Sequence, residues 1–156
     1  MTQPNTKKQP ELNIRNKKAG FEYEFLDHYT AGIVLKGTEI KSIRLGKASI
    51  NEAYCYVEKG EVFIKNMHIS PYENASFYKH DPKSVRKLLL NKHEIYKIFN
   101  KVKIEGITLI PLKVFMSGAG RAKVDIAVVR GKKLYDKRQD IKEKDAKREL
   151  GRIMKK

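Results

Sequence analysis

Aromatic and acidic residues alternate over residues 21–25, which is the pattern of a half-buried β-strand. Further segments with strand character are the short apolar runs at residues 31–35, 53–57, 62–64, 67–72, 108–115 and 123–129. The polar residues 27–30 predict a turn between the first two strands. Glu58-Lys59-Gly60-Glu61 separates two strands and predicts a hairpin. Pro71 is expected to end the strand that contains it.

Helical periodicity is confined to short segments in the folded part of the chain. Thr38 is a candidate N-cap for a helix over 39–45, and Asp81 with Pro82 predicts another helix start that residues 86–90 continue. Asn91 and Glu94 have the spacing of a capping box. The apolar residues that follow recur at helical spacing to about residue 104, and they are Ile95, Ile98, Phe99 and Val102. Gly106 is expected to close this helix.

Strands and helices do not alternate strictly, which argues against a parallel doubly wound sheet. The pattern favours a mainly β fold, a small closed antiparallel barrel of about six strands with packed helices. Residues 1–13 are expected to form a disordered segment, 14–130 the barrel domain, and 131–156 a basic C-terminal tail. No Pro-, Gly- or Ser-rich linker divides the middle of the chain.

The charge balance points to an anionic partner. The 156 residues include 34 Lys and Arg against 18 Asp and Glu, a formal net charge of +16. RNA or DNA is the leading candidate and an acidic membrane surface the second. No apolar run reaches the ~18 residues of a membrane span, and the N-terminus does not resemble a secretory signal. The single Cys55 is expected to be a packed thiol, and it suits a reducing cytoplasm.

Signals for catalysis are weak. The four histidines are scattered without metal-ligand spacing. Gly118 and Gly120 form a lone G-x-G between two predicted strands, whereas a phosphate cradle needs a helix behind it. We therefore expect no catalytic residue, no metal and no cofactor.

Basic clusters beside the predicted strands and helix ends form an electrostatic footprint. The clusters are Asn16-Lys17-Lys18, the group Lys41, Arg44 and Lys47, the pair Arg86-Lys87, and Lys123. Each cluster alone is also explained as a solvated face. Tyr72, Phe77 and Tyr78 lie in a predicted loop and are candidates for stacking on bases, the alternative being that they cover the barrel.

The tail, residues 131–156, carries eleven Lys or Arg against five Asp or Glu. Such a composition does not bury enough apolar surface to order itself, so order is expected on an anionic partner. Residues 140–156 are rich in helix formers. Ala146, Leu150, Ile153 and Met154 make a narrow apolar stripe on a helix that would be marginal alone in water.

A set of motifs in this order resembles the SsrA-binding protein family (small protein B) of bacteria. The motifs are NKKA at 16–19, AGI at 31–33, GTEIKSIRLGK at 37–47, HISPY at 68–72, DP at 81–82, RKLLLN at 86–91, GIT at 106–108 and GKKLYDKR at 131–138. The resemblance covers about residues 14–156, and the ordered set is specific where each motif alone is not.

The resemblance implies an oligonucleotide-binding-type barrel and the role of an RNA-binding adaptor. The implied partner is transfer-messenger RNA (tmRNA, also called SsrA), which the protein is expected to bind at its tRNA-like domain and to deliver with elongation factor Tu and GTP to stalled ribosomes for trans-translation. The resemblance further implies a protein without a catalytic step of its own, which is expected to act in the cytoplasm away from membranes and to be a monomer. The alternatives are another ribosome-associated RNA-binding protein with this barrel and, less favoured, a small nuclease.

The resemblance also assigns residues. For tmRNA it points to Leu89, Asn91 and Lys123, and the basic clusters add Asn16, Lys17, Lys18, Lys41, Arg44 and Lys47. Members commonly carry Glu before Ala-Gly-Ile, where this chain has Thr30, which donates a hydrogen bond but has no charge. For the ribosomal decoding centre and mRNA channel it points to Gly131, Lys132, Lys133, Tyr135, Asp136, Lys137, Arg138, Arg152, Ile153, Met154 and Lys155.

Overall fold

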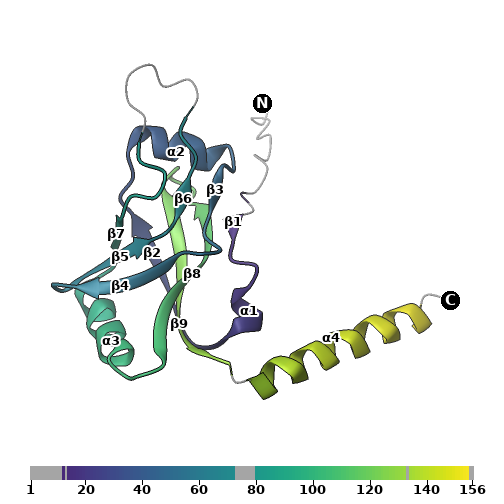
Figure 1. Cartoon of the computed structure of the whole chain (residues 1–156). Coiled ribbons are helices and arrows are strands. Elements are labelled where there is room, and N and C mark those ends of the chain that lie inside the picture. The colour runs from purple at the N-terminus through teal and green to yellow at the C-terminus, as the bar shows by residue number, and fades with distance from the viewer. Residues whose placement is uncertain (1–11, 13, 73–79, 133, 155–156) are drawn as a thin grey trace, which may run out of the picture.

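The computed structural model describes residues 12, 14–72, 80–132 and 134–154, and it is mainly β (Figure 1). The strands are β1 (Ile14–Arg15), β2 (Tyr23–Ile33), β3 (Ala48–Ser49), β4 (Tyr54–Glu58), β5 (Glu61–Lys65), β6 (His68–Ile69), β7 (Arg86–Leu89), β8 (Ile107–Met116) and β9 (Ala122–Gly131). The helices are α1 (Ala19–Glu22), α2 (Gly37–Arg44), α3 (Lys92–Val102) and α4 (Leu134–Met154).

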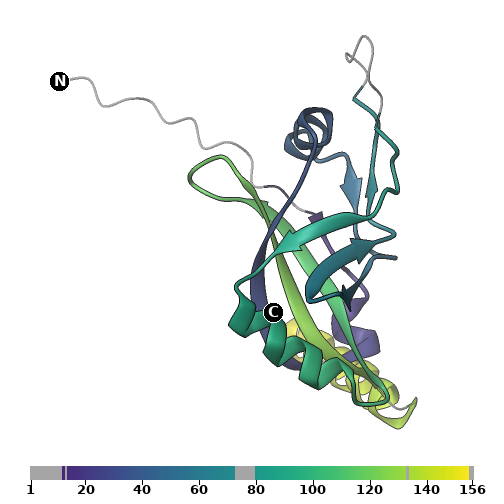
Figure 2. The same cartoon turned by 90° about the vertical axis from the view of Figure 1, so that its left-hand side faces the viewer.

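Seven strands form one antiparallel sheet in the order β1-β8-β4-β5-β7-β2-β9, and β8 also pairs with β9. The pairings therefore lead from β8 through β4, β5, β7, β2 and β9 back to β8. Strands β3 and β6 make a separate two-stranded pair. In the view of Figure 2, the long β8–β9 hairpin forms one side of the sheet and α3 lies across its end.

Alternate residues of each strand point into one apolar core, as the period of two predicts. On β9, Val124, Ile126 and Val128 are fully buried members of that core. The alternate residues Lys123 and Asp125 therefore point to the outer side of the sheet. Ala19 of α1 packs on the outer side of β8 and β9 in a second, smaller cluster, and α1 thereby covers part of that outer face.

The predicted turn at residues 27–30 is wrong, because β2 runs without a break from Tyr23 to Ile33. The strand carries only an irregularity between Phe25 and Asp27, where its register against β9 shifts. The polar side chains of Asp27, Tyr29 and Thr30, which suggested a turn, have hydrogen-bond partners on β2, β9 and α3. Asp27 accepts hydrogen bonds from the Tyr29 hydroxyl, at 2.7 Å, and from Lys101 of α3.

The predicted helix over residues 86–90 is also wrong, because Arg86–Leu89 is strand β7. It pairs with β5 through Val62 opposite Leu88, and with β2 through Gly32 opposite Leu89. A run of four residues has too little length to show a period, so the strands on either side decide its conformation.

The two helix starts differ in outcome. Asn91 caps α3 as predicted, since its Oδ1 accepts from the Glu94 backbone N–H at 2.8 Å. Helix α2 begins one residue before Thr38, and Lys36 is its N-cap residue. The hydroxyl of Thr38 instead lies 3.0 Å from Nδ1 of His80.

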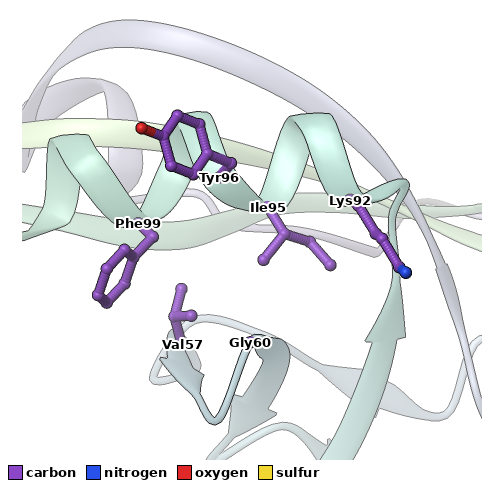
Figure 3. A pocket seen from close by; sticks show the side chains of 6 residues that line it. All are labelled: Val57, Gly60, Lys92, Ile95, Tyr96 and Phe99. Carbon is purple, nitrogen blue, oxygen red and sulfur yellow. The ribbon is translucent and has the colours of Figure 1, made fainter.

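Helix α3 crosses the β4–β5 turn and leaves an apolar groove of about 230 Å³. Ile95 and Phe99 point toward Val57 across this groove, while Tyr96 lies at its edge (Figure 3). Tyr96 is the most exposed of the large apolar residues of α3, with 65% of its surface accessible to solvent.

The C-terminal residues 134–154 form α4, which projects from the end of β9 (Figure 1). The helix begins at Leu134 and so is longer than the helix predicted from residue 140. Its base is tied to α1, because the Lys132 N–H donates to the Glu22 carbonyl and Nζ to the Gly20 carbonyl, each at 2.9 Å. Among the described residues no helix is long and apolar enough to span a membrane. The disorder expected of the free tail remains a prediction, and the segment 1–13 lies outside the described residues except for Leu12.

Candidate RNA-binding surface

Strand register brings residues from four strands into one row on the outer face of the sheet. Gly32 of β2 lies opposite Leu89 of β7 on one side and Lys123 of β9 on the other. Lys123 in turn lies opposite Phe115 of β8. We call Leu89, Gly32, Lys123 and Phe115 the four-strand row. The structure thus places Leu89 and Lys123, two predicted RNA-binding residues, beside the same glycine.

A second row lies next to the first on the same face. Thr30 pairs with Asp125, Asp125 with Lys113, and Lys113 with Arg15 of β1. The Thr30 hydroxyl donates to Asp125 Oδ1 at 2.8 Å, and Lys113 Nζ lies 3.8 Å from Oδ2. The same Nζ lies 5.3 Å from the centre of the ring of Phe115, within the range of a cation–π contact.

The cluster Asn16-Lys17-Lys18 borders these rows at β1. Asn16 donates from its backbone N–H to the Leu112 carbonyl at 2.8 Å and from Nδ2 to the Pro111 carbonyl at 3.2 Å. These bonds fix the chain beside β8, and both lysines are exposed. Lys18 makes a 3.5 Å ion pair with Glu52. A shallow depression beside the cluster is lined by Arg15, Asn16, Ala19, Gly20, Phe25, Leu112, Lys113 and Asp125.

Helix α2 and the turn after it bring basic side chains to the end of the sheet where Lys123 lies. Lys41, Arg44 and Lys47 are all exposed. Arg44 Nη2 donates to the Gly120 carbonyl in the β8–β9 turn at 3.4 Å, three residues before Lys123. Lys41 Nζ lies 5.4 Å from the ring centre of Tyr72. The other two loop aromatics, Phe77 and Tyr78, lie outside the described residues.

Arg86 does not belong to the basic surface, contrary to the sequence prediction. Its side chain is 2% exposed and pairs through Nε with the equally buried Glu39 of α2. Its other nitrogens donate to four backbone carbonyls, those of Met67, Ser84, Asp81 and Pro82. Arg86 therefore fastens α2 to β7 and positions the basic residues of α2.

Asn91 lies just after β7, two positions beyond Leu89 of the four-strand row. Its side-chain oxygen is engaged as the cap of α3, and the residue is exposed. The residue thus sets where α3 leaves the sheet, two positions after Leu89.

The predicted tail residues lie at the other end of β9 from Lys123. Gly131 is the last residue of β9 and pairs with Tyr23, and Lys132 is anchored on α1. The backbone of Tyr135, Asp136, Lys137, Arg138, Arg152, Ile153 and Met154 belongs to α4, whereas Lys133 and Lys155 lie outside the described residues. The candidate residues therefore form two separate groups, one on the sheet and the adjoining α2 region and one on the tail.

Sequence reasoning missed Phe115, Lys113 and Asp125. Alternation within residues 108–115 and 123–129 places them on the outward side of their strands, but it does not show which strands are neighbours. In the described part of the chain no cluster of His, Cys, Asp or Glu is arranged to hold a metal ion. Cys55 is a packed thiol as predicted, 4% exposed, and burial raises its pKa.

Comparisons with known proteins agree over nearly the whole chain. The family model described as SmpB protein matches residues 13–156. An SsrA-binding protein of Cytophaga hutchinsonii is 60% identical over 142 residues, which cover 91% of this chain and 93% of that protein. An SsrA-binding protein of Bacteroides thetaiotaomicron is 53% identical over 148 residues, covering 95% and 99%.

A solved structure is similar as well. It is described as "tmRNA-SmpB: a journey to the center of the bacterial ribosome", and it aligns with a TM-score of 0.66 at 45% identity. The alignment covers 78% of this chain and 85% of that one.

Proposed function

Since the chain belongs to the SmpB family, we propose that it binds SsrA RNA (tmRNA) and delivers it to stalled ribosomes in trans-translation. The observation that carries this proposal is the four-strand row, in which Lys123 and Leu89 flank Gly32 on an outer sheet face bordered by basic side chains. The protein acts as an adaptor, and the RNA and the ribosome supply the chemistry.

The surface suits a folded RNA in three ways. Lys123, Lys113 and Arg15 present charges to phosphates, and their number sets the salt dependence of binding. Leu89 is 52% exposed and offers an apolar contact to a sugar or base. Backbone pairing between the antiparallel strands fixes these groups relative to one another, so little ordering cost remains for binding.

We assign to Asp125 the acidic role that the family resemblance implies for the residue before Ala-Gly-Ile. Thr30 occupies that position here and donates its hydroxyl to Asp125. The carboxylate therefore lies one strand away on the same face, where Oδ2 can accept from a ribose hydroxyl or a base amino group.

The same family membership supports a proposal for the finer architecture. The proposed barrel is closed and of the oligonucleotide-binding type, supported by pairings that lead from β8 back to β8. The chain acts as a monomer in the cytoplasm and enters the ribosome in a complex that contains elongation factor Tu and GTP.

The tail has its own proposed role on the ribosome. Residues 131–138 contact the decoding centre, and Arg152, Ile153, Met154 and Lys155 lie along the empty mRNA channel. The anchoring of Lys132 on α1 supports this division, because it fixes the point from which the tail leaves the folded domain.

A reconstituted translation system tests the proposal. On a message without a stop codon, the protein together with charged tmRNA should produce the tagged peptide, and omission of the protein should abolish it. Tagging that proceeds equally without the protein would contradict the proposal.

A further inference from the structure

The outer face of β4 and β5 carries three aromatic rings outside both the core and the four-strand row. Tyr54 and Tyr56 project from β4 on the side opposite the buried Cys55, and Phe63 projects from β5. Tyr56 and Phe63 are cross-strand partners with stacked rings, 5.7 Å between centroids and 27° between planes. Tyr54 lies 6.4 Å from Tyr56 and is 38% exposed. We call these three rings the aromatic face.

Lysines border the aromatic face on its outer side. Lys65 lies opposite Tyr54, and Lys87 of β7 lies opposite Phe63. Lys87 Nζ makes a 2.8 Å ion pair with Glu61, in which both side chains are more than 40% exposed. An exposed pair of this kind contributes little, so the ammonium can turn to a phosphate at small cost.

The aromatic face is continuous with the four-strand row. Lys87 and Leu89 are two residues apart on β7 and therefore point to the same side of the strand. Leu89 lies in the row beside Gly32, while Lys87 lies opposite Phe63. An RNA bound on the row thus meets the aromatic face as the next surface around the sheet.

We propose that the aromatic face binds unpaired nucleotides of the same SsrA RNA whose folded part occupies the four-strand row. This inference rests on the function proposed above and extends its footprint across β7 onto β5 and β4 (Figure 1). The rings stack on bases, and Lys65 and Lys87 contact the phosphates between them. Stacking on aromatic side chains is tolerant of sequence, because every base has a π face.

The test uses the full-length protein with the substitutions Tyr54→Leu and Tyr54→Leu/Phe63→Leu. Leucine keeps the outward apolar volume and removes the aromatic ring. The matched control is Tyr96→Leu, which removes a more exposed ring from α3, beside the groove of Figure 3. Urea midpoints identify any variant that is merely unstable, and the single variant keeps the test valid if the double variant does not fold.

Binding to tmRNA is measured across a series of salt concentrations. The double variant should bind about tenfold or more weakly, with an unchanged salt slope, because stacking is lost while phosphate contacts remain. Affinity equal to that of the wild type, or a loss matched by Tyr96→Leu, would overturn the inference. Unchanged tmRNA affinity with weaker ribosome binding would also overturn it, and would assign the face to the ribosome.

Photocrosslinking identifies the contact directly. Full-length tmRNA substituted with 5-iodouridine should crosslink to the wild-type peptide that contains Tyr54 and Tyr56, and the yield should fall in the double variant. Absence of that crosslink in a complex that does form would contradict the inference. A wild-type protein that does not prefer tmRNA over an unrelated tRNA would instead contradict the proposed function, and that result is read from the wild type alone.

Discussion

The side chain of Leu89 lies over the backbone of Gly32, so closely that a Cβ added to Gly32 would stand 3.3 Å from Leu89 Cβ. Contacts this short require the neighbour to move by a few tenths of an ångström. The glycine therefore leaves room for Leu89 between β2 and the surface that we assign to RNA.

We expect Gly32→Ala to displace Leu89 and to weaken tmRNA binding by about 1 kcal/mol, roughly fivefold, with a similarly small effect on stability. Filter binding and urea unfolding measure the two effects. Gly118→Ala is the matched control, because a Cβ there has no atom within 4 Å. Equal affinity of the two alanine variants would show that the position of Leu89 does not matter for binding.

Replacement of Lys123 by Ala should weaken tmRNA binding and lower the slope of log K against log salt by about one unit, because one phosphate contact is lost. The control Lys103→Ala removes a lysine that lies over Phe99 on α3, away from the row. A slope that remains unchanged in Lys123→Ala would place this side chain off the RNA backbone.

Removal of the tail should leave RNA binding intact when the truncation spares the residues that bond to the folded domain. Gly131 pairs with Tyr23, and Lys132 bonds to α1, so the truncation should begin at residue 133. Such a protein should bind tmRNA nearly as the wild type does and should fail to tag peptides on stalled ribosomes. Comparison with a truncation that also removes Gly131 and Lys132 measures what the anchor contributes. Loss of RNA binding in the protein truncated from residue 133 would show that the tail has no role separate from RNA binding.

The buried pair Glu39–Arg86 should be a main source of stability for the α2 region. Arg86→Leu would leave the Glu39 carboxylate buried without its partner, at a cost of about 3–5 kcal/mol in the free energy of unfolding. The control Lys87→Leu breaks the adjacent exposed pair with Glu61 and should cost about 1 kcal/mol or less. Denaturant unfolding of both variants measures the difference, and equal losses would contradict the burial argument.

Acid should weaken the junction between β2 and α3. The hydrogen bond from Lys101, then that from Tyr29, lowers the pKa of Asp27 from 3.8 to about 2. The carboxylate stabilises the fold fully above its unfolded pKa, and this contribution is lost as the pH falls toward 2.

Because the side chains of Asp27 and Lys101 are both more than a third exposed, the Asp27 carboxylate should contribute about 1 kcal/mol to the free energy of unfolding. Urea unfolding at pH 5 and pH 2.5 should therefore show a larger acid loss in the wild type than in Asp27→Asn, by that amount. Equal losses would show that Asp27 does not titrate with folding.

The opposite dependence applies to Tyr29, whose pKa is raised to about 12 by burial and by the bond to Asp27. The neutral phenol stabilises the fold below pH 10, and the contribution is lost between pH 10 and 12. Tyr29→Phe should lack this alkaline loss.

Sequence signals predicted correctly those elements whose capping and apolar residues lie within the element. Helix α3 has both an N-cap and an apolar stripe, and both are present in the structure. The turn prediction for residues 27–30 was wrong because Asp27 and Thr30 form hydrogen bonds with residues distant in sequence, Lys101 and Asp125. The helix prediction for residues 86–90 was wrong because pairing with β5 and β2, which are distant in sequence, makes Arg86–Leu89 a strand.

The candidate surface was predictable only in part for the same reason. Basic clusters and motif resemblance pointed to Leu89 and Lys123, which are 34 positions apart in the sequence. Their common neighbour Gly32, and Phe115 beyond Lys123, follow only from the register of four strands. Periodicity fixes which side of a strand a residue faces, but it does not fix which strands are adjacent.

Filter binding of the full-length protein to tmRNA, in parallel with an unrelated tRNA at about 0.15 M salt, measures whether this protein prefers SsrA RNA. The wild-type protein should bind tmRNA clearly more tightly than the tRNA, and Lys123→Ala and Gly32→Ala should each bind tmRNA more weakly than the wild type does. Equal affinity of the wild-type protein for the two RNAs would contradict the proposed function.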